Sequence, residues 1–373
     1  MAPAPDSLAS LAAQFEAFAR QDCGTEPLYA ALARALADRP GLLGLLNAAP
    51  PTQQRPTLLL AALHDRLLAL TEADKPLPAL AAYYASLGGV RPPDDSLGAA
   101  LEAFAAEHEG ALLETIATQR TQTNEIGRSA VLRPALAEIS NRHGGRPLAL
   151  FDFGCSAGLN LSADRFEVAY DGQAAPGAGP PEGGTPRLAC RLVGAPPPST
   201  PWVIRQRLGV DLAPIDLADA RALRWLRACL WPSERARAER FEQAVALARA
   251  ARHPVERSDD GLAVLARWLH MLEPGVTPVL FNSWVLAYFT PAELAAHTQR
   301  VHALVQGHGL VWLSAEDDVR LAATTGLTAP ATPGDAEPGT HTFWSLTERG
   351  ARSPRQTLLA RSHPHGAWLE WLA

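Results

Sequence analysis

Cysteine is scarce in this chain of 373 residues, and the few cysteines are scattered. The four cysteines are Cys23, Cys155, Cys190 and Cys229, and no two of them have the C-x-x-C spacing. Structural zinc sites and the disulfide frameworks of small secreted proteins need cysteines at short, paired spacing. The sequence therefore predicts neither a metal centre nor a disulfide network, and it fits the reducing cytoplasm.

Concentrated positive charge is also missing. Lys75 is the only lysine, and the formal net charge is -6. No segment gathers arginines into a stripe with interleaved aromatic residues, which is the usual electrostatic footprint of a nucleic-acid-binding surface. We therefore expect no nucleic-acid partner and a small molecule as the substrate.

Long apolar runs are absent as well. No stretch of about eighteen uncharged apolar residues occurs, and residues 1–6 (MAPAPD) lack the basic and apolar segments of a secretory leader. These absences predict a cytoplasmic protein without a membrane partner. The sequence gives no indication of the oligomeric state.

Apolar residues make up 47% of the chain, which is enough for one large core or two adjoining cores. From residue 6 to about residue 145 they recur at helical spacing, as in Leu8, Leu11 and Phe15. Prolines and glycine pairs punctuate this half, and no convincing strand pattern occurs in it. Residues 1–145 are therefore predicted to form an all-helical N-terminal domain.

The hydrophobic period changes at residue 146. A short apolar run at residues 148–153 ends in a glycine-containing turn that is expected to open a helix. Further candidate strands alternate with helices downstream, and strands separated by helices predict a parallel, doubly wound α/β sheet. Residues 146–373 are the expected second domain, with a Pro- and Gly-rich insertion at about 171–201 at the sheet edge.

The end of the chain predicts a different kind of pairing. Candidate strands around residues 342–346 and 356–360 have no helix between them. They are expected to form an antiparallel pair that closes the edge of the mostly parallel sheet.

Residues 151–158 (FDFGCSAG) follow the pattern hydrophobic, acid, hydrophobic, Gly, x, Ser, x, Gly. This pattern resembles motif I of Rossmann-like methyltransferases that use S-adenosylmethionine, with Ser156 in place of the usual middle glycine. Glycines such as Gly154 and Gly158 let the backbone approach a nucleoside closely. The resemblance implies that Asp152 stabilises the cationic amino-acid part of the cofactor, directly or through water.

A second acid is expected after the next strand, because ribose hydroxyls are donors that a carboxylate accepts well. Asp211 is the candidate, although it lies about fifty residues downstream of the motif, where about twenty is usual. Asp259 follows a further candidate strand, where such enzymes often contact the adenine amino group. The predicted cofactor-binding residues are Asp152, Gly154, Ser156, Gly158, Asn160, Asp211 and Asp259.

The same turn also fits a nucleophile elbow. Residues 154–158 (GCSAG) match the pattern of α/β-hydrolases, in which Ser156 would lie on a strained turn between a strand and a helix. His341, His363 or His365 could then serve as the base. However, that fold needs several strands before the elbow, whereas the preceding 147 residues predict helices, and a buried acid beside the nucleophile is unfavourable. The methyltransferase-like interpretation is favoured, with an esterase or a noncatalytic Rossmann-like binding module as alternatives.

Five segments together resemble an uncharacterised bacterial family that carries a domain of unknown function. They are residues 122–128 (QTNEIGR), 154–161 (GCSAGLNL), 209–217 (GVDLAPIDL), 311–316 (VWLSAE) and 365–371 (HGAWLEW). The resemblance covers nearly the whole chain. It implies a methyltransferase-like fold and no established reaction.

Two polar clusters are candidates for contacts with a substrate. Gln122, Asn124, Glu125 and Arg128 precede a predicted helix, although Asn124 could simply cap that helix while Glu125 and Arg128 pair along it.

Asn282 and Ser283 follow an apolar strand, at the end where doubly wound folds place substrate contacts. Here the alternative is that Asn282 caps a helix.

Two residues are candidates for proton transfer. Glu316 follows the strand that ends near residue 314, and His365 lies in a turn beside Pro364 and Gly366. Either could act as a general base on an acceptor. Methyl transfer itself needs little besides in-line positioning, because the sulfonium donor is already activated.

Overall fold

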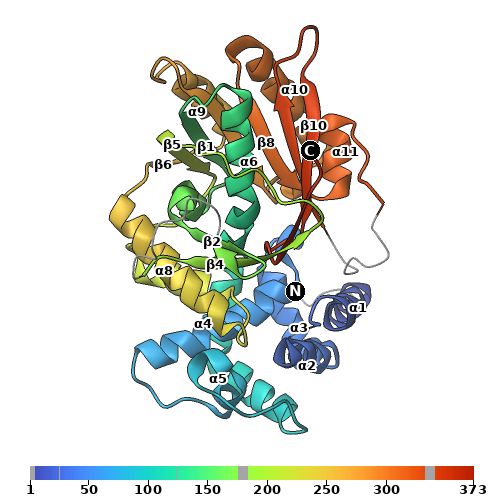
Figure 1. Cartoon of the computed structure of the whole chain (residues 1–373). Coiled ribbons are helices and arrows are strands. Elements are labelled where there is room, and N and C mark those ends of the chain that lie inside the picture. The colour runs from blue at the N-terminus through green and yellow to red at the C-terminus, as the bar shows by residue number, and fades with distance from the viewer. Residues whose placement is uncertain (1–4, 25, 123, 175–183, 332–340) are drawn as a thin grey trace. The chain divides into compact units, whose positions relative to one another are not determined.

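The computed structural model describes residues 5–24, 26–122, 124–174, 184–331 and 341–373 (Figure 1). The chain divides into two compact units, of which unit 1 holds residues 1–123 and 216–239 and unit 2 holds residues 124–215 and 240–373. Their bounds differ from those of the predicted domains. A helix at residues 129–142 belongs with the sheet, and residues 216–239 belong with the N-terminal helices.

Unit 1 is helical, and its described residues contain no strand. Its α-helices are α1 (Pro5–Gln21), α2 (Pro27–Ala37), α3 (Pro40–Leu43), α4 (Pro56–Glu72), α5 (Leu97–Thr118) and α7 (Ala220–Ala228); α8 (Arg235–Ala251) begins in it. Four short 3-10 helices connect them: η1 (Gly44–Ala48), η2 (Pro51–Gln53), η3 (Ala79–Tyr83) and η4 (Ala85–Leu87). Proline starts several of these helices, because its fixed φ suits the first turn. The core joins Phe15, Leu32 and Leu59 to Trp225 of α7.

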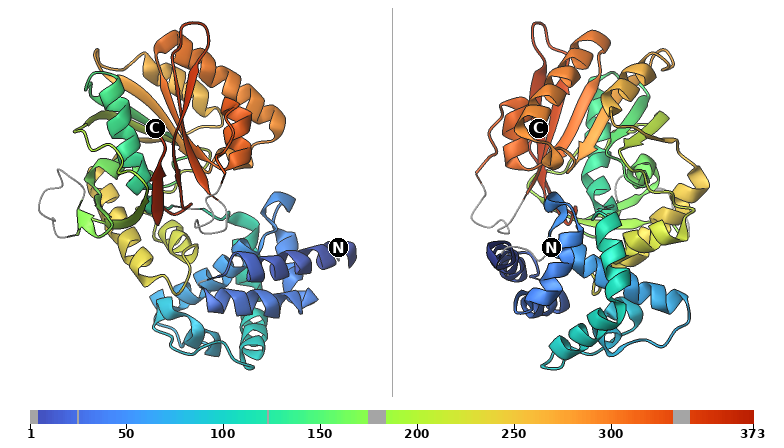
Figure 2. Two further views of the ribbon diagram at one scale, coloured as in Figure 1. Left: turned by 45° about the vertical axis from the view of Figure 1, so that its right-hand side comes forward. Right: turned by 180° about the vertical axis from the view of Figure 1, so that it is seen from behind.

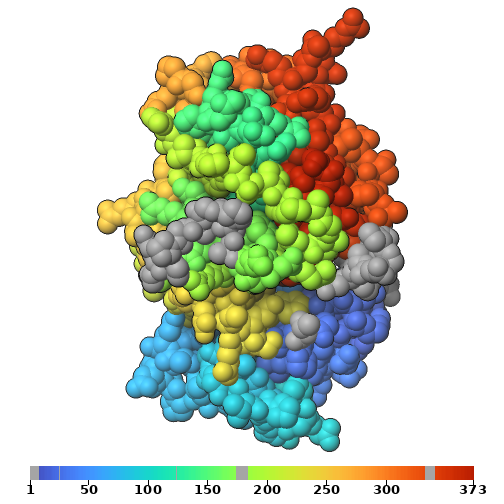
Figure 3. All heavy atoms as spheres, in the orientation of Figure 1, coloured from blue at the N-terminus to red at the C-terminus, as the bar shows by residue number. Residues whose placement is uncertain are grey.

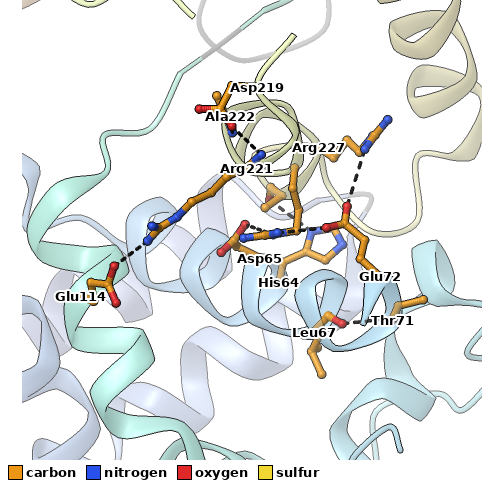
Figure 4. Close-up of polar contacts among 12 residues, drawn as sticks. His64, Asp65, Leu67, Thr71, Glu72, Glu114, Asp219, Arg221, Ala222 and Arg227 are labelled. Carbon is orange, nitrogen blue, oxygen red and sulfur yellow. Dashed lines mark hydrogen bonds and ion pairs between the residues drawn. The ribbon is translucent and has the colours of Figure 1, made fainter. Parts of the chain in front are cut away.

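Polar contacts also join α7 to α4 (Figure 4). Arg224 donates from Nε to Asp65 Oδ1 and from Nη1 to Glu72 Oε2, each at 2.9 Å. Burial raises the pKa of Asp65, and the Arg224 guanidinium opposes this shift. His64, which is buried, lies with Nδ1 3.1 Å from the Ala228 carbonyl oxygen, and burial lowers its pKa to about 4. These contacts make α7 an integral part of unit 1.

Arg224→Met should destabilise the protein by about 2 kcal/mol, because it leaves the carboxylate of Asp65 buried without its cation. The matched control is Arg221→Met, whose ion pair with Glu114 is mostly exposed at 57% and 60% and should contribute about 0.5 kcal/mol or less. Urea unfolding of the variants measures both changes. Equal effects of the two substitutions would contradict the importance assigned to Asp65.

Unit 2 contains the sheet. Its strands are β1 (Leu148–Phe153), β2 (Glu167–Tyr170), β3 (Gln173–Ala174), β4 (Arg187–Val193), β5 (Ile204–Asp211), β6 (Val255–Arg257), β7 (Thr277–Ser283), β8 (Val311–Glu316), β9 (Thr342–Glu348), β10 (Arg355–Ser362) and β11 (Trp368–Trp371). They lie in the order β3-β2-β4-β11-β10-β9-β8-β7-β1-β5-β6. β1 pairs in parallel with both β5 and β7, whereas β9 is antiparallel to β8 and to β10. The predicted doubly wound, mostly parallel sheet with antiparallel C-terminal strands is therefore confirmed.

Helices cover both faces of this sheet, as Figures 1 and 2 show for α6 on one side and α10 on the other. The helices of unit 2 are α6 (Ser129–Arg142), α9 (Gly261–Leu269), α10 (Pro291–His308) and α11 (Asp318–Thr325), with the 3-10 helices η5 (Ile126–Arg128), η6 (Leu159–Arg165) and η7 (Leu286–Tyr288). Phe151 of β1 and Leu280 of β7 pack against Leu265 of α9 and Val301 of α10. No helix of the described chain is long and apolar enough to cross a bilayer.

The helix expected after β1 does not form. The glycine turn leads instead into the 3-10 helix η6 and then directly to β2. Arginines from elsewhere take backbone carbonyls that an α-helix would use: Arg207 donates to Leu161 O, and Arg133 donates to Ala163 O. Long-range contacts thus override the local preference.

The predicted closure of the sheet by its last antiparallel pair is also wrong. β10 pairs onward with β11, which pairs in parallel with β4 of the Pro- and Gly-rich insertion. β4 alternates buried and exposed side chains, as its sequence predicts, and the edge strand is β3. Residues 175–183 of the insertion lie outside the described residues. The turn between β9 and β10 projects from the surface at the upper right of Figure 3.

Candidate cofactor-binding site

The candidate site lies at the carboxyl end of β1, where the direction of winding of the sheet reverses. β5 and β6 lie on one side of β1, and β7 and β8 lie on the other. Asp152 of β1 is paired with Gly209 of β5 and Phe281 of β7. In open α/β sheets this switch point is where ligands bind, because the loops diverge to either face there.

The turn after β1 is tight. Gly154, Ser156 and Gly158 have positive φ of 74°, 52° and 69°. A Cβ atom at Gly154 would overlap the side chain of Val285, so only glycine fits both the conformation and the space at that position. The loop after β7 therefore packs directly on the turn.

The N–H groups of this turn are already in use. All five backbone N–H groups of residues 154–158 donate within the chain at 2.8 to 3.4 Å, to Val210 O, Asp211 Oδ2, Asn124 Oδ1 and Cys155 O. A turn that cradles phosphate instead presents such groups to its ligand. This turn is suited to a ligand that brings donors and positive charge.

Asp152 is a buried acid, and one of its carboxyl oxygens accepts no hydrogen bond from the described residues. Its side chain is 3% exposed, and Oδ2 has no hydrogen-bond partner among the described residues. Burial, with a smaller contribution from the charge of Asp211, raises the pKa of Asp152 to about 7. Unsatisfied buried carboxyls with shifted pKa values concentrate at functional sites, so this group marks the site.

Asp211 ends the neighbouring strand β5. Its Oδ2 accepts from the N–H of Ser156 at 2.8 Å, and its Oδ1 accepts from the N–H of Ala213 at 2.9 Å. A carboxylate offers about four acceptor positions, so both oxygens retain capacity for further donors. The structure thus places Asp211 against the turn despite its distance in sequence.

Two other predicted cofactor residues, Asn160 and Asp259, belong to the same unit. Asn160 of η6 accepts from the Ser129 hydroxyl at 3.5 Å. Asp259 follows β6 and is exposed.

Asn124 holds the turn from the other side. Its Nδ2 donates to Ser156 Oγ at 3.0 Å, and its Oδ1 accepts from the N–H of Ala157. The cap of η5 comes instead from Glu125, which accepts from the N–H of Gly127 at 2.7 Å. Gln122 belongs to unit 1 and is not counted among the residues of this site.

Arg128 connects the site to the C-terminal turn. The guanidinium, which is 5% exposed, donates to Pro364 O at 2.9 Å and to Ser283 Oγ at 3.2 Å. His365 lies in the same turn, and its N–H donates to His363 Nδ1 at 3.0 Å. Gly127 also lies against the backbone of His365 and Gly366, so residues 124–128 and 363–366, which are far apart in the chain, meet here.

Asn282 and Glu316 form one buried network. Glu316 Oε1 accepts from Asn282 Nδ2 at 2.8 Å and from the N–H groups of Val285 and Leu286 at 3.0 and 3.2 Å. Asn282 Oδ1 accepts from the Trp312 indole at 2.6 Å. Burial raises the pKa of Glu316 to about 7 against these hydrogen bonds. Oε2 of Glu316 has no partner among the described residues, which leaves it able to take a proton.

Two residues of the loop after β7 belong to this site in addition to the predicted ones. Trp284 has a positive φ of 56°, and its indole donates to Thr342 Oγ1 at 2.8 Å. Val285 fills the space beside Gly154. Val285 is an apolar residue in a loop and gave no sequence signal; only the absence of a side chain at Gly154 indicates that something packs there.

The geometry does not favour a nucleophile elbow. Ser156 has the positive φ of such a residue, but β1 is the first strand in the described part of the chain, and no α-helix follows the turn. The hydroxyl of Ser156 accepts from the Asn124 amide at 3.0 Å.

Fold and site together define an α/β protein with a doubly wound, Rossmann-like sheet and an acid-flanked glycine turn at its switch point. Residues 12–371 match the family described as "Uncharacterized protein conserved in bacteria (DUF2332)", and the chain belongs to this family. The resemblance predicted from the five segments is thereby confirmed. No curated protein matches the chain.

Two solved structures are similar in part. One is DesVI of Streptomyces venezuelae, at 11% identity and a TM-score of 0.23, over 62% of this chain and 75% of that one. The other is an S-adenosylmethionine-dependent methyltransferase from Clostridium acetobutylicum ATCC 824, at 11% identity and a TM-score of 0.23, over 69% of this chain and 78% of that one.

Proposed function

We propose that this protein binds S-adenosylmethionine at the carboxyl end of β1 and transfers its methyl group to a small molecule. One observation carries the proposal: Asp152 is buried at the switch point of the sheet, and one of its oxygens has no donor in the part of the chain that the structure describes. The turn beside it has no free N–H for an anionic ligand. A cationic ligand that brings N–H and O–H donors satisfies this arrangement.

The residues of the site fit this cofactor by the chemistry of their side chains. Asp152 would hold the ammonium group, since an ionised carboxylate needs a cation when buried. Asp211 would accept from the ribose hydroxyls, and Asp259 would accept from the adenine amino group. Asn160 and the turn with Ser156 would complete the pocket.

The bound cofactor would supply an activated methyl group, so the chain has to position the acceptor and manage a proton. Arg128 donates to Ser283 and to Pro364, and it would fix the loops around an acceptor. Glu316, with a pKa of about 7 and one free oxygen, can receive a proton near neutral pH. His365 is the second candidate for this role. Asn124, Glu125 and Asn282 keep the surrounding loops in place.

Calorimetric titration tests the proposal. We expect micromolar binding of S-adenosylmethionine and of S-adenosylhomocysteine, and at least about tenfold weaker binding by Asp152→Asn, because a neutral amide loses the charge-assisted contact. Asp318→Asn is the matched control, since Asp318 is an exposed acid elsewhere in unit 2.

Nucleotides that carry phosphate test the specificity of this binding. ATP and NAD carry the same adenosine with phosphates, and we expect them to bind poorly because the turn has no N–H groups to offer. A folded protein that binds neither sulfur compound, or binds ATP equally well, would overturn the proposal. Binding without transfer to any acceptor would indicate the noncatalytic module instead.

A further inference from the structure

A depression lies at the opposite end of the sheet from the candidate site. It has a volume of about 420 Å³ and is lined by residues just before β1, β7 and β8 and around the β9–β10 turn. Ligand pockets commonly have volumes of a few hundred cubic ångströms, so a small molecule fits here. All of its lining residues belong to unit 2, and none of them takes part in the proposed methyl transfer.

Positive charge dominates the lining. Four arginines line it, Arg142, Arg146, Arg349 and Arg355, against the carboxylate of Glu348; Arg142 is also paired with Glu138 at 2.6 Å, which leaves 4 − 2 = 2 excess positive charges. Within the described chain, neither Arg146 nor Arg349 pairs with a carboxylate. Such an excess is unusual in a protein whose formal net charge is -6.

Glu348 organises two of these arginines. Its carboxylate accepts from Arg142 Nη1 at 3.1 Å and from Arg355 Nη2 at 2.8 Å, and it lies 3.2 Å from His143 Nε2. Burial alone would raise the pKa of Glu348, but these hydrogen bonds and the arginine charges lower it to about 2. Each guanidinium has five N–H donors, so both arginines keep donors for a further acceptor. Glu348 therefore orients the cations without neutralising the depression.

An unsatisfied donor points to the same ligand chemistry. Thr277, the first residue of β7, lines the depression, is 3% exposed, and has a buried hydroxyl without a partner among the described residues. Buried hydroxyls nearly always find an acceptor in a folded protein. An anionic ligand seated against Thr277 would provide one once the wall around this hydroxyl, which has no solvent access in the free protein, adjusts to it.

We propose that this depression is a second ligand site, which binds a small soluble phosphorylated compound with at least two negative charges. Guanidinium groups recognise phosphate through paired N–H donors, and several arginines around one depression favour more than one phosphate oxygen. The proposal stands on this cluster and does not depend on the methyl-transfer activity.

The test uses tripolyphosphate as the probe, with pyrophosphate, orthophosphate and citrate for comparison, all at one fixed ionic strength. We expect saturable binding of tripolyphosphate at one site per chain, weaker binding of orthophosphate, and a rise in the unfolding temperature. The double variant Arg146→Gln/Arg349→Gln should bind at least about tenfold more weakly. The control Arg191→Gln/Arg205→Gln makes the same change of charge at exposed positions on β4 and β5 and should bind normally.

Thr277→Val separates binding from folding. It removes a hydroxyl that has no partner and keeps the shape of the side chain, so the free protein should be as stable as the original or more so. Tripolyphosphate should nevertheless bind it several-fold more weakly. Titration of S-adenosylmethionine into the same variants should be unchanged, which distinguishes failure of this site from failure of the first.

Three results would overturn the proposal. One is a response that follows ionic strength alone. Another is equal loss of binding in the Arg191/Arg205 control. The third is citrate binding as tight as that of tripolyphosphate, which would indicate general attraction of anions rather than recognition of phosphate.

Discussion

Asp152→Asn is expected to stabilise the free protein at pH 8 while it weakens cofactor binding. The pKa of Asp152 rises from an ordinary 3.8 to about 7 in the fold, chiefly because of burial. Between these values the folded state keeps a proton that the unfolded state has lost, so stability falls as pH rises through this window. Asparagine is neutral and similar in shape, and it should therefore gain about 2 kcal/mol at pH 8 and almost nothing at pH 4. Urea unfolding at both pH values measures the difference.

Proton release provides an independent check on Asp152. Below pH 7 a cationic ligand must displace the proton of Asp152, so calorimetry at pH 6 should show an enthalpy of binding that varies with the ionisation enthalpy of the buffer. This dependence should vanish in the asparagine variant, provided that enough ligand binds to be measured. If asparagine destabilises the protein equally at pH 4 and pH 8, Asp152 is ionised and satisfied in the free protein, and the assignment of the site fails.

Gly366→Ala is expected to destabilise the protein by about 3 kcal/mol or more. Gly366 has a positive φ of 73°, and an added Cβ atom would overlap the carbonyl group of Gly127, which is backbone and cannot move aside. This close approach holds the C-terminal turn against η5, and with it the contact of Arg128 to Pro364. Thermal unfolding measures the loss.

Gly307→Ala is the matched control for this prediction. Gly307 lies in α10, and a Cβ atom there would meet nothing within 4 Å. Alanine favours a helix over glycine by up to about 1 kcal/mol, so this variant should be slightly more stable than the original protein. A mild effect of Gly366→Ala would show that the two segments can separate, and that Arg128 is not fixed by them.

The sequence predicts elements well where local pattern decides the structure. The buried strands β1, β7 and β8 coincide with short apolar runs, and the change of hydrophobic period at residue 146 marks the start of the sheet. Local pattern fails where distant side chains decide. The arginines that capture the carbonyls of Leu161 and Ala163 come from β5 and α6, so nothing near η6 in the sequence announces its short 3-10 form.

In the candidate site, too, local sequence pattern predicts some residues, and contacts between distant segments decide the others. The motif at residues 151–158 predicts the turn and includes Asp152. The expectation of a second acid for the ribose hydroxyls leads to Asp211. The contact of Asn124 with Ser156 depends on a loop more than thirty residues earlier, and no periodicity encodes it. Asn282 and Glu316, predicted for separate roles, belong to one network because β7 and β8 are neighbours in the sheet.

The split of unit 1 along the chain has a consequence for biosynthesis. Its core includes Trp225 and Ala228, which a ribosome adds only after most of the N-terminal helices have emerged. A nascent chain that ends at residue 215 therefore carries helices whose apolar core is still incomplete, together with β1 and β5 but without β7 and β8. Domains of large proteins usually fold in the order of their synthesis. Here neither unit can complete its core before synthesis of the other has begun.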